Sequence, residues 1–281
     1  MRRHEKGPCL SRRAREIRAM FSAIAPFYDR LNHLLSFSID RLWRRRIVAR
    51  SLAAFARQES PGTAADAISI PAADRPRVLD VCAGTGDLAR AYARRLMARG
   101  RVVALDFSHE MLLHGVRKFC AGARDAPSSR PRDGRRRRAP ILPVEADALR
   151  LPFASGAFDL AAVAFGLRNL VDRPGGLAEM ARVVRPGGQV LALEFGLPES
   201  RWMRRLYGFY LHQVLTRVGN RVSGSAAYAY LTESVEEFPA PDEVRTWMEG
   251  AGLVNVTGEP WTGGIVRLYR GFAPPKERRP S

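Results

Sequence analysis

One segment limits what this chain can fold into more than any other: VLDVCAGTGDL, residues 78–88. It opens with a short apolar run that ends in Asp80, and Gly84 and Gly86 follow just before a helical pattern begins. Glycines at such a turn permit backbone angles that other residues avoid, and they let a ligand approach the main chain closely. The segment therefore predicts a strand, a tight turn and a helix around a ligand site.

Apolar strand patterns alternate with helical patterns along the rest of the chain. We predict strands at 77–82, 101–106, 141–145, 158–164 and 189–194, and helices at 88–99, 109–119, 174–184 and 202–218. The chain then carries an alternating pair, 253–257 and 264–269, that is typical of an antiparallel hairpin. This order predicts an α/β, Rossmann-like fold with a seven-stranded, mostly parallel sheet, helices on both faces and a C-terminal antiparallel hairpin.

The 281 residues suffice for one large domain with a core, since 46% of them are apolar. The expected parts are a basic N-terminal helical lid broken at Pro26 (1–57), a linker (58–76), a catalytic domain (77–271) and a tail (272–281). Within the catalytic domain, residues 121–140 nearly lack large apolar side chains and are expected to form a disordered basic insertion.

The formal net charge is +18, and it is concentrated in three peripheral segments. Residues 1–57 hold 14 lysines and arginines against 4 acids, residues 117–138 hold 9 against 2, and residues 270–281 hold 4 against 1. A protein that reads nucleic acid would carry its cations across a folded face, so we expect no nucleic-acid partner. The same charge distribution is compatible with an anionic membrane surface as a partner.

We expect the chain to be cytoplasmic. No apolar run approaches the roughly 18 residues needed to span a bilayer, and the basic N-terminus lacks the apolar core of a secretory signal. The three cysteines, Cys9, Cys82 and Cys120, form no CxxC pair, which argues against a disulfide framework and a cysteine zinc site. The five histidines show no metal-binding spacing, so we expect no metal.

The acid that ends the second strand indicates what kind of ligand the turn binds. Asp106 lies twenty residues after Gly86, where a carboxylate accepts both hydroxyls of a ribose. The spacing Gly84-x-Gly86-x-x-Ala89 by itself also fits a dinucleotide site, so a nucleoside ligand is indicated without deciding which one.

Three features favour S-adenosyl-L-methionine over a dinucleotide. Asp80 precedes the first glycine by four residues, where an anion suits an ammonium group and repels a pyrophosphate. Asp147 and Ala148 follow the third strand, where a short polar side chain bonds an adenine amine, and RVVRPGG (182–188) turns a helix into a strand. The series resembles the class I methyltransferases. An NAD-dependent reductase is the alternative, which Asp80 and the missing third glycine disfavour.

A narrower resemblance covers the chain from Phe21 to Gly271. FSAIAPFYDRLNHLLS (21–36), followed by Asp40, Trp43 and Arg44, is similar to the N-terminal signature of the ubiquinone/menaquinone biosynthesis C-methyltransferases (UbiE type). The motifs FGLRNL (165–170), LEFGLP (193–198), YAYLTESVEEFP (228–239) and TGGIVRLYRG (262–271) match that family in order and spacing. The resemblance implies an enzyme that methylates a ring carbon of a prenylated quinol with S-adenosylmethionine. Demethylmenaquinol is favoured over a benzoquinol, because the N-terminal segment is more similar to menaquinone-type members.

The resemblance also implies where the cofactor is bound. Its contacts fall on Thr85, Asp106, Asp147 and Ala148, in addition to Asp80, Gly84 and Gly86 from the residue pattern. Many members carry a serine directly before FGLRN, and this chain has Ala164 there. The run 122–138 is longer than the family usually carries. Neither departure touches the core motifs.

The implied reaction requires that a phenolate is stabilised and that water is excluded. Arg168 follows the fourth strand, at the functional edge of such sheets, and is expected to hold the phenolate or to position a water. Arginine itself is a poor base. Asn169 is expected to donate to the other ring oxygen, and Tyr28 and Asp29 to lie in the lid over the cofactor. A structural salt bridge is the alternative role for Arg168, and packing alone is the alternative for Tyr28.

The implied substrate is extremely apolar and comes from a bilayer. The aromatic segment 202–218 is expected to form a rim for the prenyl tail or the surface of a homodimer, with a simple core helix as the alternative. The basic segments are expected to favour residence at the inner face of an anionic membrane. Another phenol or a small lipid is an alternative acceptor, and a basic nucleic-acid-binding protein is the alternative from a different class.

Overall fold

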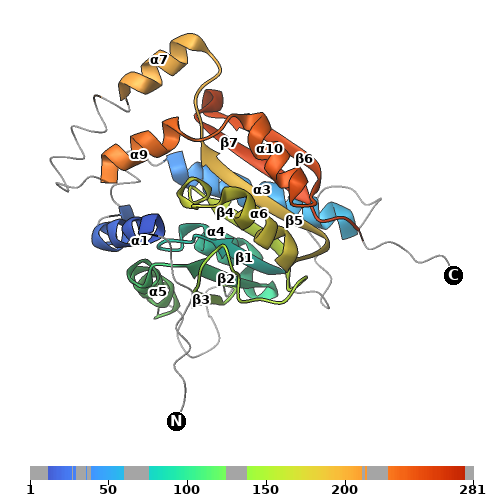
Figure 1. Ribbon diagram of the computed structural model, residues 1–281. Coiled ribbons are helices and arrows are strands. Elements are labelled where there is room, and N and C mark those ends of the chain that lie inside the picture. Colours follow the sequence, from blue (N-terminus) through green and yellow to red (C-terminus); the bar gives the residue numbers. More distant parts are fainter. Residues whose placement is uncertain are drawn as a thin grey trace.

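The computed structural model describes residues 12–26, 28–29, 36, 39–59, 76–124, 138–210, 213 and 227–275. Seven strands form one sheet in the order β3-β2-β1-β4-β5-β7-β6 (Figure 1). They are β1 (Arg77–Val81), β2 (Arg101–Asp106), β3 (Ile141–Glu145), β4 (Phe158–Ala164), β5 (Val184–Phe195), β6 (Val254–Trp261) and β7 (Val266–Phe272). Strands β1 to β5 pair in parallel, and β7 runs antiparallel between β5 and β6. The expected α/β fold class is confirmed, including the antiparallel C-terminal hairpin.

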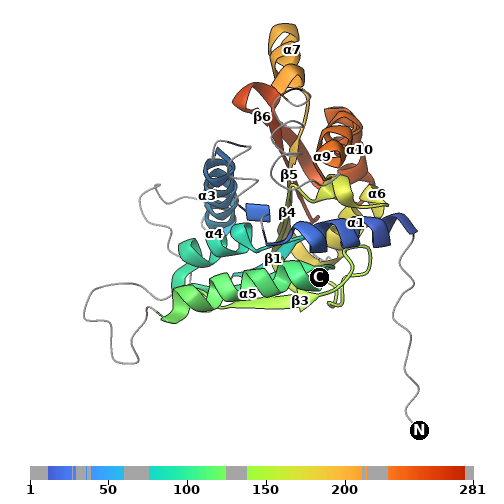
Figure 2. The ribbon, with the colours of Figure 1, turned by 90° about the vertical axis from the view of Figure 1, so that its left-hand side faces the viewer.

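Helices cover both faces of the sheet, as Figure 2 shows with the sheet seen nearly edge-on. One face carries α3 (Ile39–Glu59), α4 (Asp87–Leu96) and α5 (His109–Arg124), and the other carries α6 (Arg173–Val183) and α10 (Pro241–Gly250). Each face has its own apolar core, around Ile47 and Tyr92 on the first and around Leu177 and Met248 on the second. Because both faces are covered, β4 is buried along almost its whole length rather than at alternate residues.

The N-terminal segment that we expected to be a lid divides into two parts. α3 belongs to the core, since Trp43, Ile47 and Leu52 pack within it and the Trp43 indole Nε1 donates to Thr262 Oγ1 at 2.9 Å. The expected lid therefore does not include α3, because the apolar face of that helix is buried on the sheet. Leu42, on the outer side of the same helix, is 62% exposed.

α1 (Arg12–Ile24) lies across the carboxyl edge of the sheet, against α5 and α9 (Ala227–Glu236). Only Ala14 and Ile17 of this helix are buried. Its polar links are exposed, as in the hydrogen bond from Ser22 Oγ to Glu110 at 2.6 Å. A helix with so little buried apolar surface has low local stability, which a segment that opens and closes over a site requires. We call α1, together with Tyr28 and Asp29, the cover.

Several elements differ in length from their predicted bounds, and the hairpin strands β6 and β7 extend to Trp261 and Phe272, past the predicted ends at 257 and 269. α5 continues to Arg124, past the predicted end at 119 and into the expected insertion 121–140, of which residues 125–137 lie outside the described residues. β5 begins at Val184 rather than 189, because Val184 already pairs with Phe158 before the Pro-Gly-Gly irregularity. α7 (Arg201–Phe209) confirms the first half of the predicted helix 202–218, and nearly all of 211–218 lies outside the described residues.

The remaining elements are short. They are the 3₁₀ turns η1 (Met97–Arg99), η2 (Leu167–Asn169) and η4 (Thr262–Gly264). Of the expected linker, the structure describes only residues 58 and 59, which end α3, and Pro76. The expected tail is described only as far as residue 275. Across the part of the chain that the structure describes, no helix combines the length and the apolarity needed to cross a bilayer.

Candidate active site

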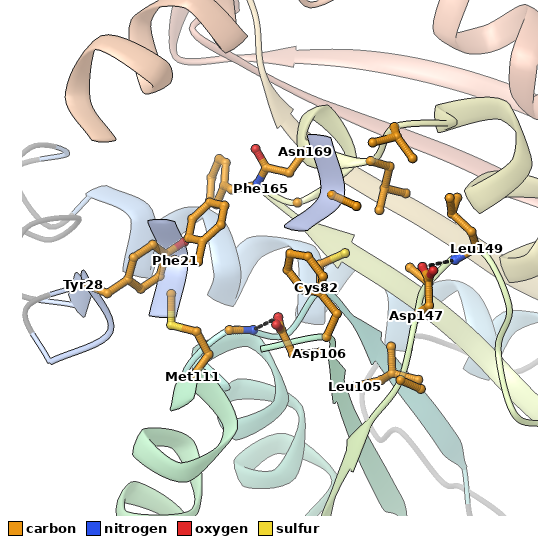
Figure 3. Close-up of a pocket in the computed structure, with 18 residues that line it drawn as sticks. Phe21, Tyr28, Cys82, Leu105, Asp106, Met111, Asp147, Leu149, Phe165 and Asn169 are labelled. Atoms are coloured by element: carbon orange, nitrogen blue, oxygen red, sulfur yellow. Dashed lines mark hydrogen bonds between the residues drawn. The ribbon is translucent and has the colours of Figure 1, made fainter. Parts of the chain in front are cut away.

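A pocket of about 230 Å³ opens at the carboxyl ends of β1, β2 and β4, where the chain order within the sheet reverses. Open parallel sheets bind ligands at such a point, because the loops that follow neighbouring strands diverge there. Figure 3 shows Asp147 and Leu149 at one end, Cys82 and Asp106 in the middle, and an aromatic group at the other end. We call Phe21, Tyr28, Phe165 and Asn169 the aromatic end of the pocket.

The loop after β1 takes a conformation that favours glycine. Gly84 and Gly86 have φ angles of 56° and 75°, in the left-handed region. A Cβ atom on Gly86 would lie 2.3 Å from the ring of Phe119, so this position has no room for a side chain. Gly84 lines the pocket directly, which lets a ligand approach its backbone.

Asp80 lies behind the pocket wall. Its side chain is buried, and its Oδ2 accepts the backbone N–H of Ala89 at 2.8 Å, which fastens the start of α4 to the strand end. Burial, together with the nearby carboxyl groups of Asp106 and Asp87, raises the pKa of Asp80 to about 8. Asp80 therefore supports the turn and does not line the pocket.

Asp106 forms the floor of the pocket at its middle. Its Oδ2 accepts the backbone N–H of Gly84 at 2.7 Å, and its Oδ1 accepts that of Ser108 at 2.9 Å. A carboxylate has about four acceptor sites, so acceptor capacity remains for a ligand. Burial raises the pKa of Asp106 to about 6 in spite of these hydrogen bonds.

The end of the pocket after β3 is polar, and the middle is rich in carboxyl groups. Asp147 and Ala148 line the polar end, and Asp147 Oδ1 accepts the backbone N–H of Leu149 at 2.9 Å. Burial, and then four surrounding acids that include Asp106, raise the pKa of the Cys82 thiol. The thiol stays protonated, and the local field favours a cationic ligand.

The aromatic end offers flat apolar walls and one amide. The rings of Phe165 and Phe195 lie 4.5 Å apart, and Phe21 meets Tyr28 edge to face at 6.0 Å. Asn169 Oδ1 accepts the hydroxyl of Tyr230, from α9, at 3.1 Å. With its oxygen so engaged, Asn169 has its amide N–H groups to offer to a ligand.

A buried ion pair stands beside the aromatic end. Arg168 Nη1 donates to Glu194 Oε1 at 2.5 Å, and both side chains are buried. Burial alone would lower the pKa of Arg168, but Glu194, Tyr28 and Tyr230 outweigh it and raise that pKa, so the guanidinium is charged. The salt bridge that was the alternative role of Arg168 is therefore present. Its buried Nε, however, has no hydrogen-bond partner among the described residues, which points to a ligand or a water there.

Comparison with known proteins decides the family. The model of the ubiE/COQ5 methyltransferase family matches residues 10–273, nearly the whole chain. The chain belongs to this family. The enzyme class and the cofactor that the motifs implied, a methyltransferase that uses S-adenosylmethionine, are confirmed.

Curated relatives of this methyltransferase match more than nine-tenths of its chain. A Geobacter sulfurreducens protein named ubiquinone/menaquinone biosynthesis C-methyltransferase UbiE is 39% identical over 262 residues, which cover 93% of this chain and 90% of that protein. A Thermus thermophilus protein named demethylmenaquinone methyltransferase is 39% identical over 256 residues, which cover 91% of this chain and 100% of that protein.

Solved structures support the same fold. An O-methyltransferase family protein from Burkholderia thailandensis superposes with a TM-score of 0.52 and 15% identity, over 88% of this chain and 60% of that one. A second structure is a chain of the complex between the Haloferax volcanii Trm112 methyltransferase activator and the putative methyltransferase. It superposes with a TM-score of 0.51 and 17% identity, over 90% of this chain and 97% of that one. At these identities the likeness shows the fold alone.

The pocket residues of this methyltransferase fit S-adenosylmethionine. The cofactor carries an ammonium and a sulfonium, and the carboxyl groups around Cys82 favour such charges and oppose a pyrophosphate. We propose that Asp106 accepts the ribose hydroxyls, and that Asp147 and the backbone at Ala148 bind the adenine. The sulfonium methyl would then face the aromatic end.

The affinity for S-adenosylmethionine is expected to fall as the pH is lowered through about 6. Only the ionised Asp106 accepts both hydroxyls, and its pKa of about 6 means that a proton competes with the ligand below that pH. The dissociation constant should rise by up to about tenfold per pH unit there, as measured by calorimetry between pH 5 and 7. Asp106→Asn should bind more weakly at pH 7 and lose the slope. An unmodified protein with a flat profile would contradict the assignment.

Asp29 ties the cover of the pocket to the glycine loop. Its carboxylate accepts the hydroxyl of Thr85 and pairs with Lys118 of α5. Lys118 Nζ also donates to Thr85 Oγ1 at 2.8 Å and to Asp87 Oδ1 at 2.9 Å. These four residues form a latch that holds the neighbouring Tyr28 close to the glycine loop.

Lys118→Met is expected to release the cofactor faster. Without the ammonium group, Asp29 and Asp87 lose their shared partner, and the cover opens more often. Dissociation of S-adenosylhomocysteine, followed by stopped flow, should become about three- to tenfold faster. Arg117→Met, which removes the neighbouring charge from an exposed position, is the matched control and should leave the rate unchanged. Equal rates for the two variants would show that the latch has no such role.

The structure brings some predicted site residues to the pocket and places others around it. Those that line it are Tyr28, Gly84, Asp106, Asp147, Ala148 and Asn169, and those that support it are Asp29, Asp80, Thr85, Gly86 and Arg168. Sequence reasoning missed Glu194, Tyr230 and Lys118 as site residues. The sequence does contain a signal for Glu194, because it is an acid in the otherwise apolar run VLALEF (190–195). Nothing in the sequence distinguishes Lys118 from the other basic residues. Nowhere in the described ranges do His, Cys, Asp and Glu side chains gather as metal ligands would.

Proposed function

We propose that this enzyme transfers the methyl group of S-adenosylmethionine to a ring carbon of a prenylated quinol, and that the acceptor is demethylmenaquinol, which becomes menaquinol. The observation that carries the proposal is the aromatic end of the pocket with the charged, buried Arg168 beside it. The name of the Thermus thermophilus relative supports the naphthoquinol. The equivalent benzoquinol of ubiquinone biosynthesis is the second candidate, because the name of the Geobacter sulfurreducens relative covers both pathways.

The residues at the aromatic end supply what this C-methylation requires. Bound S-adenosylmethionine supplies a methyl group on a sulfonium, which is a good leaving group. A quinol ring carbon becomes nucleophilic when the neighbouring hydroxyl is ionised, and the Arg168 guanidinium stabilises the negative charge of that phenolate. The methyl–carbon bond forms as the methyl–sulfur bond breaks, and the electron pair of the broken bond stays on the sulfur of S-adenosylhomocysteine. The ring carbon then loses its proton to a water molecule, which restores the aromatic ring. Arg168 does not take the hydroxyl proton itself; a water at its Nε takes it.

Two further groups orient the acceptor ring. Asn169, held by Tyr230, donates to the second ring oxygen and fixes which carbon faces the methyl group. Phe165 and Tyr28 provide the apolar walls, and the cover that carries Tyr28 excludes bulk water.

We further propose that the enzyme works as a peripheral protein at the cytoplasmic face of a membrane. A prenylated quinol resides in the bilayer, so the pocket must be loaded from there. The support is the positive charge of the chain, +18, which favours an anionic lipid surface.

The quinone content of the source cell tests the proposed function. Without this protein, a demethylated naphthoquinone should accumulate, and the reintroduced protein should restore the methylated form. Arg168→Ala is the matched control and should not restore it. A demethylated benzoquinone in its place would favour the second candidate, and an unchanged quinone profile would contradict both.

A further inference from the structure

α7 stands clear of the sheet in both views, at the top of Figures 1 and 2. Three large apolar side chains on it are exposed: Trp202 by 66%, Leu206 by 60% and Phe209 by 61%. Their spacing of four and three residues places them on one face of the helix. We call these three residues the apolar stripe of α7. Monomeric proteins rarely expose such large side chains together without a partner.

The opposite face of α7 carries one buried side chain that lies towards the active site. Tyr207 is buried, and it lies close enough to Arg168 and Glu194 to interact with their charges. Arg204 Nε donates to the backbone oxygen of Pro198, just after β5, at 2.9 Å. Tyr207 therefore lies on the face of α7 that is turned to Arg168 and Glu194, and the apolar stripe is turned to the outside.

The charges around the apolar stripe are all positive. Arg201 and Arg205 are exposed and follow one flank of the stripe, and α7 contains no acidic residue. The acid just before the helix, Glu199, is paired with Arg267 at 2.5 Å. An apolar face bordered by arginines is the pattern of helices that lie in the surface of an anionic bilayer.

We propose that the apolar stripe of α7, with Arg201 and Arg205, docks the protein on an anionic lipid bilayer. This inference rests on the proposed function and adds the surface that brings the site to its lipid-borne substrate. The side chains of Trp202, Leu206 and Phe209 enter the boundary between headgroups and acyl chains, and the two arginines bind lipid phosphates. Since Tyr207 on the opposite face lies near Arg168 and Glu194, docking in this orientation brings that side of the active site to the bilayer.

A second copy of the chain fits the apolar stripe less well than a bilayer does. A stable protein interface buries roughly 800 Å² on each partner, which one nine-residue helix does not supply by itself. Two stripes packed together would also bring the arginines of both copies close to one another, with no acid on α7 to pair with them.

Sedimentation with vesicles tests the docking surface without any quinol. Vesicles of phosphatidylglycerol and phosphatidylethanolamine should bind the full chain, and phosphatidylcholine vesicles should bind it much less. The variant Trp202→Ser/Leu206→Ser/Phe209→Ser should partition at least about tenfold more weakly. Leu42→Ser/Leu142→Ser removes apolar side chains that are 62% and 59% exposed elsewhere, and this matched control should bind as the unmodified protein does. Arg201→Gln/Arg205→Gln should weaken binding and reduce its dependence on salt.

Three results would overturn the proposal. The first is a stripe variant that binds as well as the unmodified protein. The second is binding that is lost in Arg94→Gln/Arg138→Gln, two arginines that lie near each other on another surface, and kept in the stripe variant. The third is an unmodified protein that binds no vesicles and is a dimer that the stripe variant dissociates, in which case the surface takes a second copy.

Turnover separates this proposal from the proposed function. The stripe variant should methylate a quinol in detergent micelles at the normal rate and lose activity only when the quinol is embedded in vesicles. Loss of activity in both settings would mean that the stripe serves the site itself and would contradict the docking role. If the unmodified protein methylates no quinol and still binds vesicles through the stripe, the docking surface stands and the proposed function fails.

Discussion

Arg168→Ala is expected to lower kcat by at least about a hundredfold and to change the dissociation constant of S-adenosylmethionine by less than about threefold. The guanidinium is a buried positive charge beside the aromatic end, where the phenolate develops. The proposed cofactor contacts, at Asp106 and Asp147, are independent of it. Turnover at saturating quinol and cofactor gives kcat, and calorimetry gives the dissociation constant.

Two controls make this result specific. Arg168→Lys keeps the charge and loses the second nitrogen of the fork, so its kcat should fall between those of the alanine variant and the unmodified enzyme. Arg185→Ala breaks another arginine–carboxylate pair, with Asp159 at 2.5 Å, at the far edge of the sheet, and should leave kcat unchanged. An alanine variant at position 168 with normal turnover, or with a loss only in cofactor affinity, would show that Arg168 is structural alone.

Glu194→Gln is expected to cost about 3–5 kcal/mol of folding stability, because it leaves the Arg168 guanidinium buried without a counter-ion. Glutamine has the same size, but its one oxygen can replace only one of the two carboxylate oxygens: Oε2 accepts the backbone N–H of Arg168 at 3.2 Å, and Oε1 accepts that of Phe195 at 3.0 Å. The loss therefore reports the charge together with one hydrogen bond, and not a cavity. The midpoint of thermal unfolding should fall by roughly 10 °C, and denaturant unfolding should give the free energy.

The double variant Glu194→Gln/Arg168→Met checks the cause of that loss. With the cation also removed, no buried charge lacks a partner, so more than half of the lost stability should return. A Glu194→Gln variant that loses less than about 1 kcal/mol, or a double variant whose losses simply add, would contradict a desolvated pair.

The parts of the fold that could be predicted from the sequence are those with a local cause. The strand–turn–helix around Gly84 and Gly86 can be predicted from one short segment, because the left-handed backbone of the turn needs glycine. The acids that end β2 and follow β3, Asp106 and Asp147, could be placed because the carboxyl ends of parallel strands meet at one edge.

The parts that could not be predicted depend on contacts between distant segments. α3 and α1 have similar helical patterns, and only the assembled sheet shows that Trp43 and Ile47 are core while α1 covers the pocket. Lys118 is one of 46 basic residues and becomes notable only through its distance to Asp29 and Thr85.

The sequence contains a signal for α10, which was not predicted, but none for the orientation of the Asp80 side chain. α10 has a proline at its start and Asp242 and Glu243 in its first turn, which are ordinary signs of a helix start. Asp80 was expected to act on the cofactor because of its place before the glycines, but the fold turns its carboxyl group to Ala89 and buries it. Its sequence position is the same for both roles, so only the direction of the side chain distinguishes them.

Methyl transfer to defined quinols tests the central claim most directly. The purified protein is incubated with S-adenosylmethionine that carries a labelled methyl group, and with reduced demethylmenaquinone or the matching benzoquinol, each with the same short prenyl tail, in detergent. We expect the label to enter the naphthoquinol ring, with one methyl group in place of one hydrogen, and to do so faster than it enters the benzoquinol. A protein that binds S-adenosylmethionine and labels neither quinol would contradict it.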